Sequence, residues 1–167
     1  MLKITTEVKK QFNEIIEKEL VYPVYQPIIS LQDGKLMGYE ALSRISVDSP
    51  EFSIEEMFQI SEKLNKVWEL EELCRKKSIE NAKECPKGVK LYINVNPNVL
   101  KARQFHDSMT TSYLKAYGFK NKDIVFEITE RSSIDDHELF SKIIQHYKKQ
   151  DFKIAIDDFG DGYAGLN

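Results

Sequence analysis

Three apolar segments at regular spacing constrain the fold of this chain more than any other feature of its sequence. They are "GVKLYINVNP" at residues 88–97, "KDIVFEITE" at residues 122–130 and "FKIAIDD" at residues 152–158. Each segment has a polar residue toward its end: Asn94, Glu127 and Asp157. Asn94 and Glu127 are 33 residues apart, and Glu127 and Asp157 are 30 apart, which is the length of one strand-helix-strand unit. We therefore predict parallel strands, buried on both faces, whose polar residues lie together at the carboxyl edge.

The remaining segments predict helices and a hairpin. Apolar residues at helical spacing predict an N-terminal helix within residues 1–20, capped by Thr6. Ser53 and Glu56 form the capping box of another helix. A third helix is expected from about residue 67, and "HELFSKIIQHYKKQ" carries the apolar stripe of a further one. Two strands, "VYPVYQPII" and "KLMGYEALSRI", flank Asp33-Gly34, which is typical of a hairpin turn.

Composition excludes several classes of protein. The chain has 167 residues, of which 41% are apolar, and its 24 basic and 27 acidic residues leave a net charge of −3. This balance argues against a nucleic-acid polymer or a membrane surface as partner. No segment has the length of a membrane span or the pattern of an export signal. Cys74 and Cys85 fit no metal or disulfide spacing, so we expect reduced thiols in a cytoplasmic protein.

The polar residues at the strand ends predict a site for hard divalent cations. The set comprises Asn94, Glu127, Asp157 and Asp158, together with Glu40. Glu40 lies inside the second strand and must point toward the same edge to join the others. It offers only oxygen ligands, which Mg²⁺ or Mn²⁺ prefers, whereas zinc favours His or Cys. Adjacent aspartates suit two metals that share a displacement at phosphorus. A single carboxylate at a strand end is more often a helix cap or a solvated group, but five such residues in phase favour a site. Glu130 either caps the following helix or holds the glycine-rich segment after Asp158.

Five ordered motifs resemble a known family. They are "YQPI" at residues 25–28, "GYEALSR" at 38–44, "INVNP" at 93–97, "FEITE" at 126–130 and "DDFGDGYAGL" at 157–166. These motifs resemble the EAL family, the bacterial phosphodiesterases that linearise cyclic di-GMP. The resemblance covers residues 21–167 and implies an α/β fold: a partial TIM-like (β/α) barrel of the EAL type, with about five strands and the first antiparallel to the others.

The resemblance also implies roles for individual residues. By matching positions, Glu40, Asn94, Glu127 and Asp157 look like ligands of a first metal, and Asp158 looks like a ligand of a second. Glu40, Asp157, Asp158 and Glu130 match catalytic positions, Glu130 being similar to a glutamate that steadies the loop after the paired aspartates. Gln26, Leu42 and Arg44 match substrate-binding positions, with Arg44 on a phosphate. The implied activity is two-metal hydrolysis of cyclic di-GMP to linear pGpG.

Some features depart from the family pattern. Asp161 stands where Thr, Ser or Ala is usual, and Asn96 stands where Ser is common. A whole barrel has eight strands in about 250 residues, whereas this chain supplies about five, and later catalytic positions of the family have no counterpart. We therefore expect residues 21–167 to be the N-terminal part of a domain that is inactive alone. Its open edge favours a homodimer or a strand-exchanged oligomer. The alternative function is a cyclic di-GMP receptor or protein-interaction module without hydrolysis.

Overall fold

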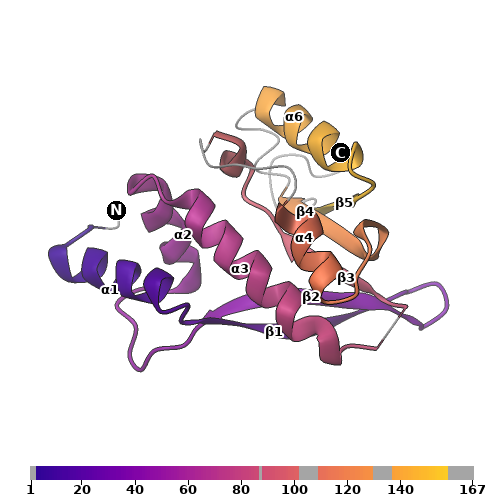
Figure 1. The fold of residues 1–167 in the computed structure, drawn as a ribbon, viewed down its shortest axis with the longest axis horizontal. Coiled ribbons are helices and arrows are strands. Elements are labelled where there is room, and N and C mark those ends of the chain that lie inside the picture. Colours follow the sequence, from indigo (N-terminus) through magenta and orange to yellow (C-terminus); the bar gives the residue numbers. More distant parts are fainter. Residues whose placement is uncertain (1–2, 87, 102–108, 130–136, 158–167) are drawn as a thin grey trace, which may run out of the picture.

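Five strands form one sheet in which the order in space equals the order in the chain (Figure 1). The computed structural model describes residues 3–86, 88–101, 109–129 and 137–157. The strands are β1 (Val21–Ile29), β2 (Leu36–Ile45), β3 (Lys90–Asn94), β4 (Ile124–Thr129) and β5 (Lys153–Asp157). β1 and β2 pair antiparallel, and all later neighbours pair parallel. The predicted five-stranded α/β sheet with an antiparallel first strand is thus confirmed.

The described helices lie on one side of this sheet (Figure 1). They are α1 (Thr6–Glu17), α2 (Ile54–Lys63), α3 (Val67–Asn81), α4 (Met109–Ala116) and α6 (His137–Lys148), with 3₁₀ helices η1 (Ala82–Glu84), η2 (Pro97–Lys101) and η3 (Asn121–Asp123). Among the described residues, no helix combines the length and the apolar character needed to cross a membrane. The arrangement leaves the opposite face of the sheet without a helical cover in the described part of the chain.

Two apolar clusters hold the helices in place. The larger joins the sheet to α3, α4 and α6 and includes Ala41, Trp68, Ile79, Leu91, Ile93, Leu114, Ile124, Phe126, Ile128, Ile143 and Tyr147. Its aromatic centre is Phe126 against Tyr147, whose ring centroids are 4.1 Å apart. The smaller cluster packs α1, α2 and α3 together through Phe12, Ile15, Met57, Ile60 and Leu70. Each helix thus packs its apolar side against the sheet or a neighbouring helix, which explains why the helices cover this face of the sheet.

The predicted helix starts and hairpin are confirmed, with one correction. Ser53 Oγ accepts from the backbone N–H of Glu56, and Glu56 Oε2 accepts from that of Ser53, so the capping box is present. The hairpin turns at Gly34, which has φ +68°. The prediction that Thr6 caps the first helix is wrong: Thr5 is the N-cap, and its hydroxyl accepts from Val8 N–H, because the cap residue must precede the first helical residue.

The prediction that the parallel strands are buried on both faces holds for β4 and is wrong for β3 and β5. In β4, residues 124–128 are all buried. In β3, Leu91 and Ile93 are buried, whereas Tyr92 is half-buried and Asn94 is exposed. No residue of β5 is fully buried. Strands alternate their side chains between two faces, and helices cover only one face here, so β3 shows the alternation of a half-covered sheet.

Removal of the capping box at the start of α2 gives a modest test of this fold. Ser53→Ala leaves the Glu56 N–H without its acceptor, so we expect a loss of about 1 kcal/mol in the free energy of unfolding. Urea denaturation followed by circular dichroism measures this loss. Ser53→Thr keeps the hydroxyl and should stay within a few tenths of a kcal/mol of the wild type. An equal loss in both variants would contradict the capping role.

Candidate metal and substrate site

The strand register places the predicted ligands on one face of the sheet. Glu40 pairs with Gln26 on one side and with Tyr92 on the other. Asn94 pairs directly with Glu127, and Glu127 pairs with Ala155, two residues before the end of β5. Paired residues share a face, as do residues two apart in one strand. The side chains of Glu40, Asn94, Glu127 and Asp157 therefore point to the face opposite the helices.

A hydrogen bond connects two of the predicted ligands that are distant in sequence. Asn94 Nδ2 donates to Glu40 Oε1 at 2.8 Å, across 54 positions of the chain. One residue later, Val95 N–H donates to the backbone oxygen of Glu127 at 2.9 Å. The expectation that Glu40 points toward the residues at the ends of β3 and β4 is confirmed for Asn94.

Glu127 is the most perturbed group of this face. Its side chain is only 8% exposed, and its Oε2 is buried without a hydrogen-bond partner among the described residues. Burial, together with the negative charges of Glu40 and Asp157, raises the pKa of Glu127 to about 8. A buried carboxyl with an unsatisfied oxygen and two acidic neighbours gains most from a cation, which would lower that pKa and supply the missing partner.

The described donors suit a hard divalent cation in kind, although they do not form a closed cage. Among residues 3–86, 88–101, 109–129 and 137–157, no three His, Cys, Asp or Glu side chains lie close enough together to hold a metal ion. The charges of Glu40 and Asp157 oppose ionisation of Glu127, and a bound cation would offset this repulsion. Carboxylate and amide oxygens are the ligands that Mg²⁺ and Mn²⁺ take. Asp158 and Glu130 lie outside the described residues.

The predicted substrate residues lie beside these donors. Gln26 is exposed and faces Glu40 across the β1–β2 pair. Leu42 and Arg44 are half-buried, and they follow Glu40 along β2 at spacings of two and four residues, so they share its face. Arg44 Nη1 donates to the backbone oxygen of Ser43 at 2.8 Å, which occupies one of the five guanidinium donors and leaves others for an anion.

Tyr92 also lies on this face, although the sequence motifs did not predict it. This residue lies two positions before Asn94 and therefore on the same face. Burial raises the pKa of the Tyr92 hydroxyl, as does the charge of Glu127. Its ring lies against Gly38, because a Cβ added there would come within 2.7 Å of Tyr92 Cε2. The alternation of Tyr92 with Leu91 and Ile93 was the available signal, but it was hidden by the expectation that both faces of β3 are buried.

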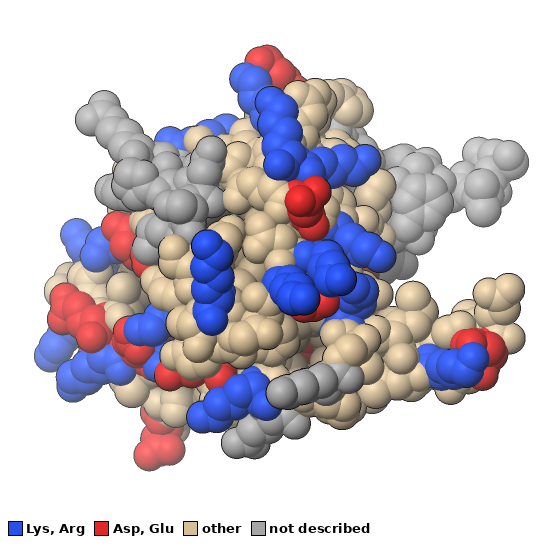
Figure 2. Space-filling model, turned by 45° about the vertical axis from the view of Figure 1, so that its right-hand side comes forward, with Lys and Arg blue, Asp and Glu red and all other residues tan. Residues whose placement is uncertain are grey.

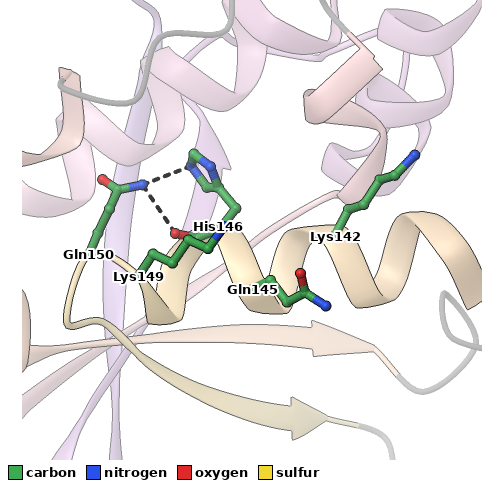
Figure 3. Close-up of a pocket in the computed structure, with 5 residues that line it drawn as sticks. All are labelled: Lys142, Gln145, His146, Lys149 and Gln150. Carbon is green, nitrogen blue, oxygen red and sulfur yellow. Dashed lines mark hydrogen bonds between the residues drawn. The ribbon is translucent and has the colours of Figure 1, made fainter.

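A surface pocket lies elsewhere, along α6 (Figure 3). It has a volume of about 300 Å³ and is lined by Lys142, Gln145, His146, Lys149 and Gln150. Gln150 Nε2 lies 2.9 Å from His146 Nε2 and 3.4 Å from the backbone oxygen of His146. Among the residues that the structure describes, no predicted site residue lines this pocket. Figure 2 shows basic side chains interspersed with fewer acidic ones on the face in view.

Comparison with known proteins gives consistent matches. The family model described as "EAL domain" matches residues 9–167. The chain is 31% identical over 153 residues to "Probable cyclic di-GMP phosphodiesterase PdeI" of Escherichia coli (strain K12), covering 87% of this chain and 19% of that protein. It is 26% identical over 172 residues to "Cyclic di-GMP phosphodiesterase PdeA" of Borreliella burgdorferi, covering 100% of this chain and 25% of that protein. The chain thus spans a quarter or less of these two relatives.

Solved structures agree with the family match. The structure of Klebsiella pneumoniae BlrP1 with calcium and cyclic di-GMP superposes with a TM-score of 0.74 at 26% identity, covering 88% of this chain and 36% of that one. Its manganese and cyclic di-GMP complex at pH 6 gives a TM-score of 0.73 at the same identity, covering 88% and 37%. The five-stranded sheet described above therefore has the arrangement found in these proteins.

Proposed function

Because the chain belongs to the EAL domain family, we propose that it forms the metal-binding part of a cyclic di-GMP phosphodiesterase. The observation that carries this proposal is Glu127 Oε2, which is buried and has no hydrogen-bond partner among the described residues. It lies beside Glu40 and Asp157 on the sheet face opposite the described helices. The names of the curated relatives and the calcium and manganese complexes of BlrP1 with cyclic di-GMP support the same assignment of substrate and divalent cation.

Glu40, Asn94, Glu127 and Asp157 would hold a first Mg²⁺ or Mn²⁺, and Asp158 would take part in holding a second. Bound there, the cations would supply charge neutralisation at the phosphodiester and activation of water for attack at phosphorus. Asn94 contributes an amide oxygen while its Nδ2 donates to Glu40, which orients both ligands. Glu127 must lose its proton before it can bind a cation, since its pKa lies near 8 in the metal-free chain.

The substrate would lie across the open face between β1 and β4. Arg44 would turn a guanidinium edge to a phosphate, since this group matches the geometry of two phosphate oxygens. Gln26 and Leu42 would orient the dinucleotide beside Glu40. Glu130 would steady the chain that follows Asp157 and Asp158. Hydrolysis of one of the two phosphodiester bonds would give linear pGpG as the product.

We expect these 167 residues alone to bind the cation but to hydrolyse cyclic di-GMP weakly or not at all. Gln26 and Asn94 are exposed, so the described part of the site admits water, and catalytic electrostatics are strongest where water is excluded. Association of copies through the edge of β5, as a homodimer or a strand-exchanged oligomer, would cover part of this face. The second candidate function, binding of cyclic di-GMP without hydrolysis, is favoured by the same exposure.

Metal-dependent ligand binding tests the proposal. We expect Mn²⁺ to raise the affinity for cyclic di-GMP at least about tenfold over a sample treated with chelator, because the phosphates would face uncompensated carboxylates without it. Asp157→Asn should remove most of this gain. Equilibrium dialysis measures the affinity, and chromatography of the same samples detects pGpG.

A matched control and two outcomes complete this experiment. Asp151→Asn makes the same chemical change at an exposed residue before β5 and should bind like the wild type. Metal-independent binding in all three proteins would favour the receptor function instead. Rapid formation of pGpG would contradict the expectation of weak activity while supporting the phosphodiesterase assignment.

A further inference from the structure

The turn that follows Asn94 is held by two carboxylates from two different helices. Glu71 Oε1, on α3, accepts from the backbone N–H of Asn96 at 2.8 Å. Glu62 Oε1, on α2, accepts from the side-chain amides of Asn96 and Asn98, each at 3.0 Å. Asn96 Oδ1 in turn accepts from the backbone N–H of Asn98 at 2.9 Å. These four bonds fix the chain just beyond the end of β3.

Glu71 belongs to a buried polar network on the helix side of the sheet. Glu71 and Arg75 are 4% and 5% exposed, and Arg75 Nη2 lies 3.4 Å from Glu71 Oε2. Arg75 also donates to Tyr147 Oη at 3.0 Å and to Thr110 Oγ1 at 2.9 Å. Its guanidinium lies 5.0 Å from the ring centre of Phe126. The network therefore joins α3, α4 and α6 behind β4.

The hydrogen bonds of Glu71 favour its carboxylate form, whereas burial raises the pKa of this group. Its two oxygens accept from a backbone N–H and from a guanidinium, and both groups can only donate. An ionised group this deep in a protein is costly, and an apolar replacement of similar volume often serves stability as well or better. Stability alone is thus a weak explanation for a carboxylate at this position. The need of the Asn96 N–H for a fixed acceptor is a more specific explanation.

We propose that Glu71, assisted by Glu62, is a positioning residue that holds the turn after β3 so that Asn94 can meet Glu40 and Glu127 around a divalent cation. This inference rests on the proposed function, in which Asn94 is a metal ligand. Neither Glu71 nor Glu62 touches the metal or the substrate in this assignment. Both act through the backbone and side chains of the turn.

The coupling from Glu71 to the site runs through two consecutive backbone N–H groups. Val95 N–H donates to the Glu127 oxygen on β4, and Asn96 N–H donates to Glu71 on α3. The chain after Asn94 is thereby tied to both layers of the fold. Loss of the Glu71 acceptor would free the turn and let the Asn94 side chain leave the orientation set by its bond to Glu40. Partners that orient metal ligands typically contribute 10- to 100-fold to metal affinity.

Glu71→Gln provides the main test in the 167-residue chain. Glutamine has nearly the same shape, but its NH₂ group must face either Arg75 or the Asn96 N–H, and both are donors. We expect Mn²⁺ affinity, titrated by electron paramagnetic resonance of the free ion, to fall about tenfold. Exchange of the Asn96 amide hydrogen, measured by NMR without metal, should become faster in the same variant.

Three further variants separate positioning from general stability. Glu72→Gln removes a neighbouring carboxylate of α3 that accepts from Tyr113 Oη, and it should leave Mn²⁺ affinity unchanged. Tyr147→Phe removes a hydroxyl from the Arg75 network but keeps the Glu71–Asn96 bond, so it should lower thermal stability without a comparable loss of affinity. Glu62→Ala changes an exposed side chain, so we expect the variant to fold. It should weaken Mn²⁺ binding about threefold, a smaller effect than the 10- to 100-fold typical of groups that orient metal ligands.

The outcomes are distinct. Unchanged Mn²⁺ affinity in Glu71→Gln and Glu62→Ala, with a wild type that binds Mn²⁺, would overturn the positioning role and leave the proposed function intact. If Glu71→Gln does not fold, unchanged affinity in Glu62→Ala would overturn the proposal by itself. A wild type that binds no Mn²⁺ would overturn both the proposed function and this inference. Loss of Mn²⁺ affinity in Glu71→Gln and Glu62→Ala, without a comparable loss in Glu72→Gln and Tyr147→Phe, supports the inference.

Discussion

Replacing Gly38 by alanine should destabilise the folded chain by about 3 kcal/mol or more. An extra methyl group in a packed interior typically costs about 1–3 kcal/mol, and the cost is higher where the neighbouring atoms cannot move away. A Cβ at this position would lie 2.3 Å from the backbone oxygen of Lys90 and 2.7 Å from Tyr92 Cε2. The Lys90 oxygen cannot move aside cheaply, because Gly38 and Lys90 are paired in the β2–β3 ladder. Glu40 lies two residues further along β2, so the same shift would displace a proposed metal ligand.

A second glycine supplies the matched control. Gly34→Ala adds the same methyl group at a position with nothing within 4 Å, although its φ of +68° strains any other residue. The expected cost there is about 1–2 kcal/mol from the left-handed backbone alone. Urea denaturation of both variants, followed by circular dichroism, gives the comparison. A smaller loss for Gly38→Ala than for Gly34→Ala would refute the steric argument.

Replacing Glu127 by glutamine should move metal affinity and metal-free stability in opposite directions. The substitution removes a proposed ligand charge, so Mn²⁺ affinity should fall by more than the 10- to 100-fold typical of groups that only orient ligands. It also removes a buried carboxyl whose ionisation is opposed by burial and by Glu40 and Asp157. The metal-free variant should therefore be more stable than the wild type at pH 9.

The pH dependence follows from the raised pKa of Glu127. Between about pH 4.5 and about pH 8 the folded chain keeps a proton that the unfolded chain has lost, so the contribution of Glu127 to stability falls as pH rises through this window. Mn²⁺ affinity should rise over the same window and level off above it, because the metal needs the ionised form.

The measurements that check this prediction are Mn²⁺ titrations and urea denaturation at pH 6, 7, 8 and 9. Glu138→Gln is the control: it removes an exposed carboxylate that pairs with Lys142 and should leave the pH profiles of Mn²⁺ affinity and of stability unchanged. Gln150→Glu would add a charge and is therefore not a suitable control. Equal stability of Glu127→Gln and the wild type at pH 9, without metal, would contradict the proposed burial penalty.

Local sequence patterns were sufficient to predict the sheet and the face that carries the proposed metal ligands. The three apolar segments that carry Asn94, Glu127 and Asp157 predicted parallel strands. The reason is that these polar residues recur at the same phase, at spacings of 33 and 30 residues. Asp33-Gly34, between two further strand-like segments, added the antiparallel hairpin. The contact between Glu40 and Asn94 follows from these two facts together, since adjacent strands place residues of equal phase side by side.

The buried network behind the sheet could not be predicted in the same way. Helix α3 contains "ELEELCRKK", a run of charges that normally indicates a solvated helix face. Glu71 and Arg75 are instead buried, because their partners Asn96, Thr110 and Tyr147 come from segments 25 to 72 positions away in the chain. Local periodicity carries no information about such partners. The half-exposure of β3 was missed for a similar reason, as it depends on what covers the second face.

The order of the strands has a consequence for biosynthesis. Since β1 to β5 follow one another in space as they do in the chain, each strand that leaves the ribosome can add to the edge formed just before it. The β1–β2 hairpin is local, whereas parallel pairs such as Gly38 with Lys90 join residues 52 positions apart and form more slowly. Domains generally fold from the N-terminus during synthesis. The proposed donors would then be added one strand at a time: Glu40 would be placed first, Asn94 would join it through their hydrogen bond, and Glu127 would follow only when these two partners are in place.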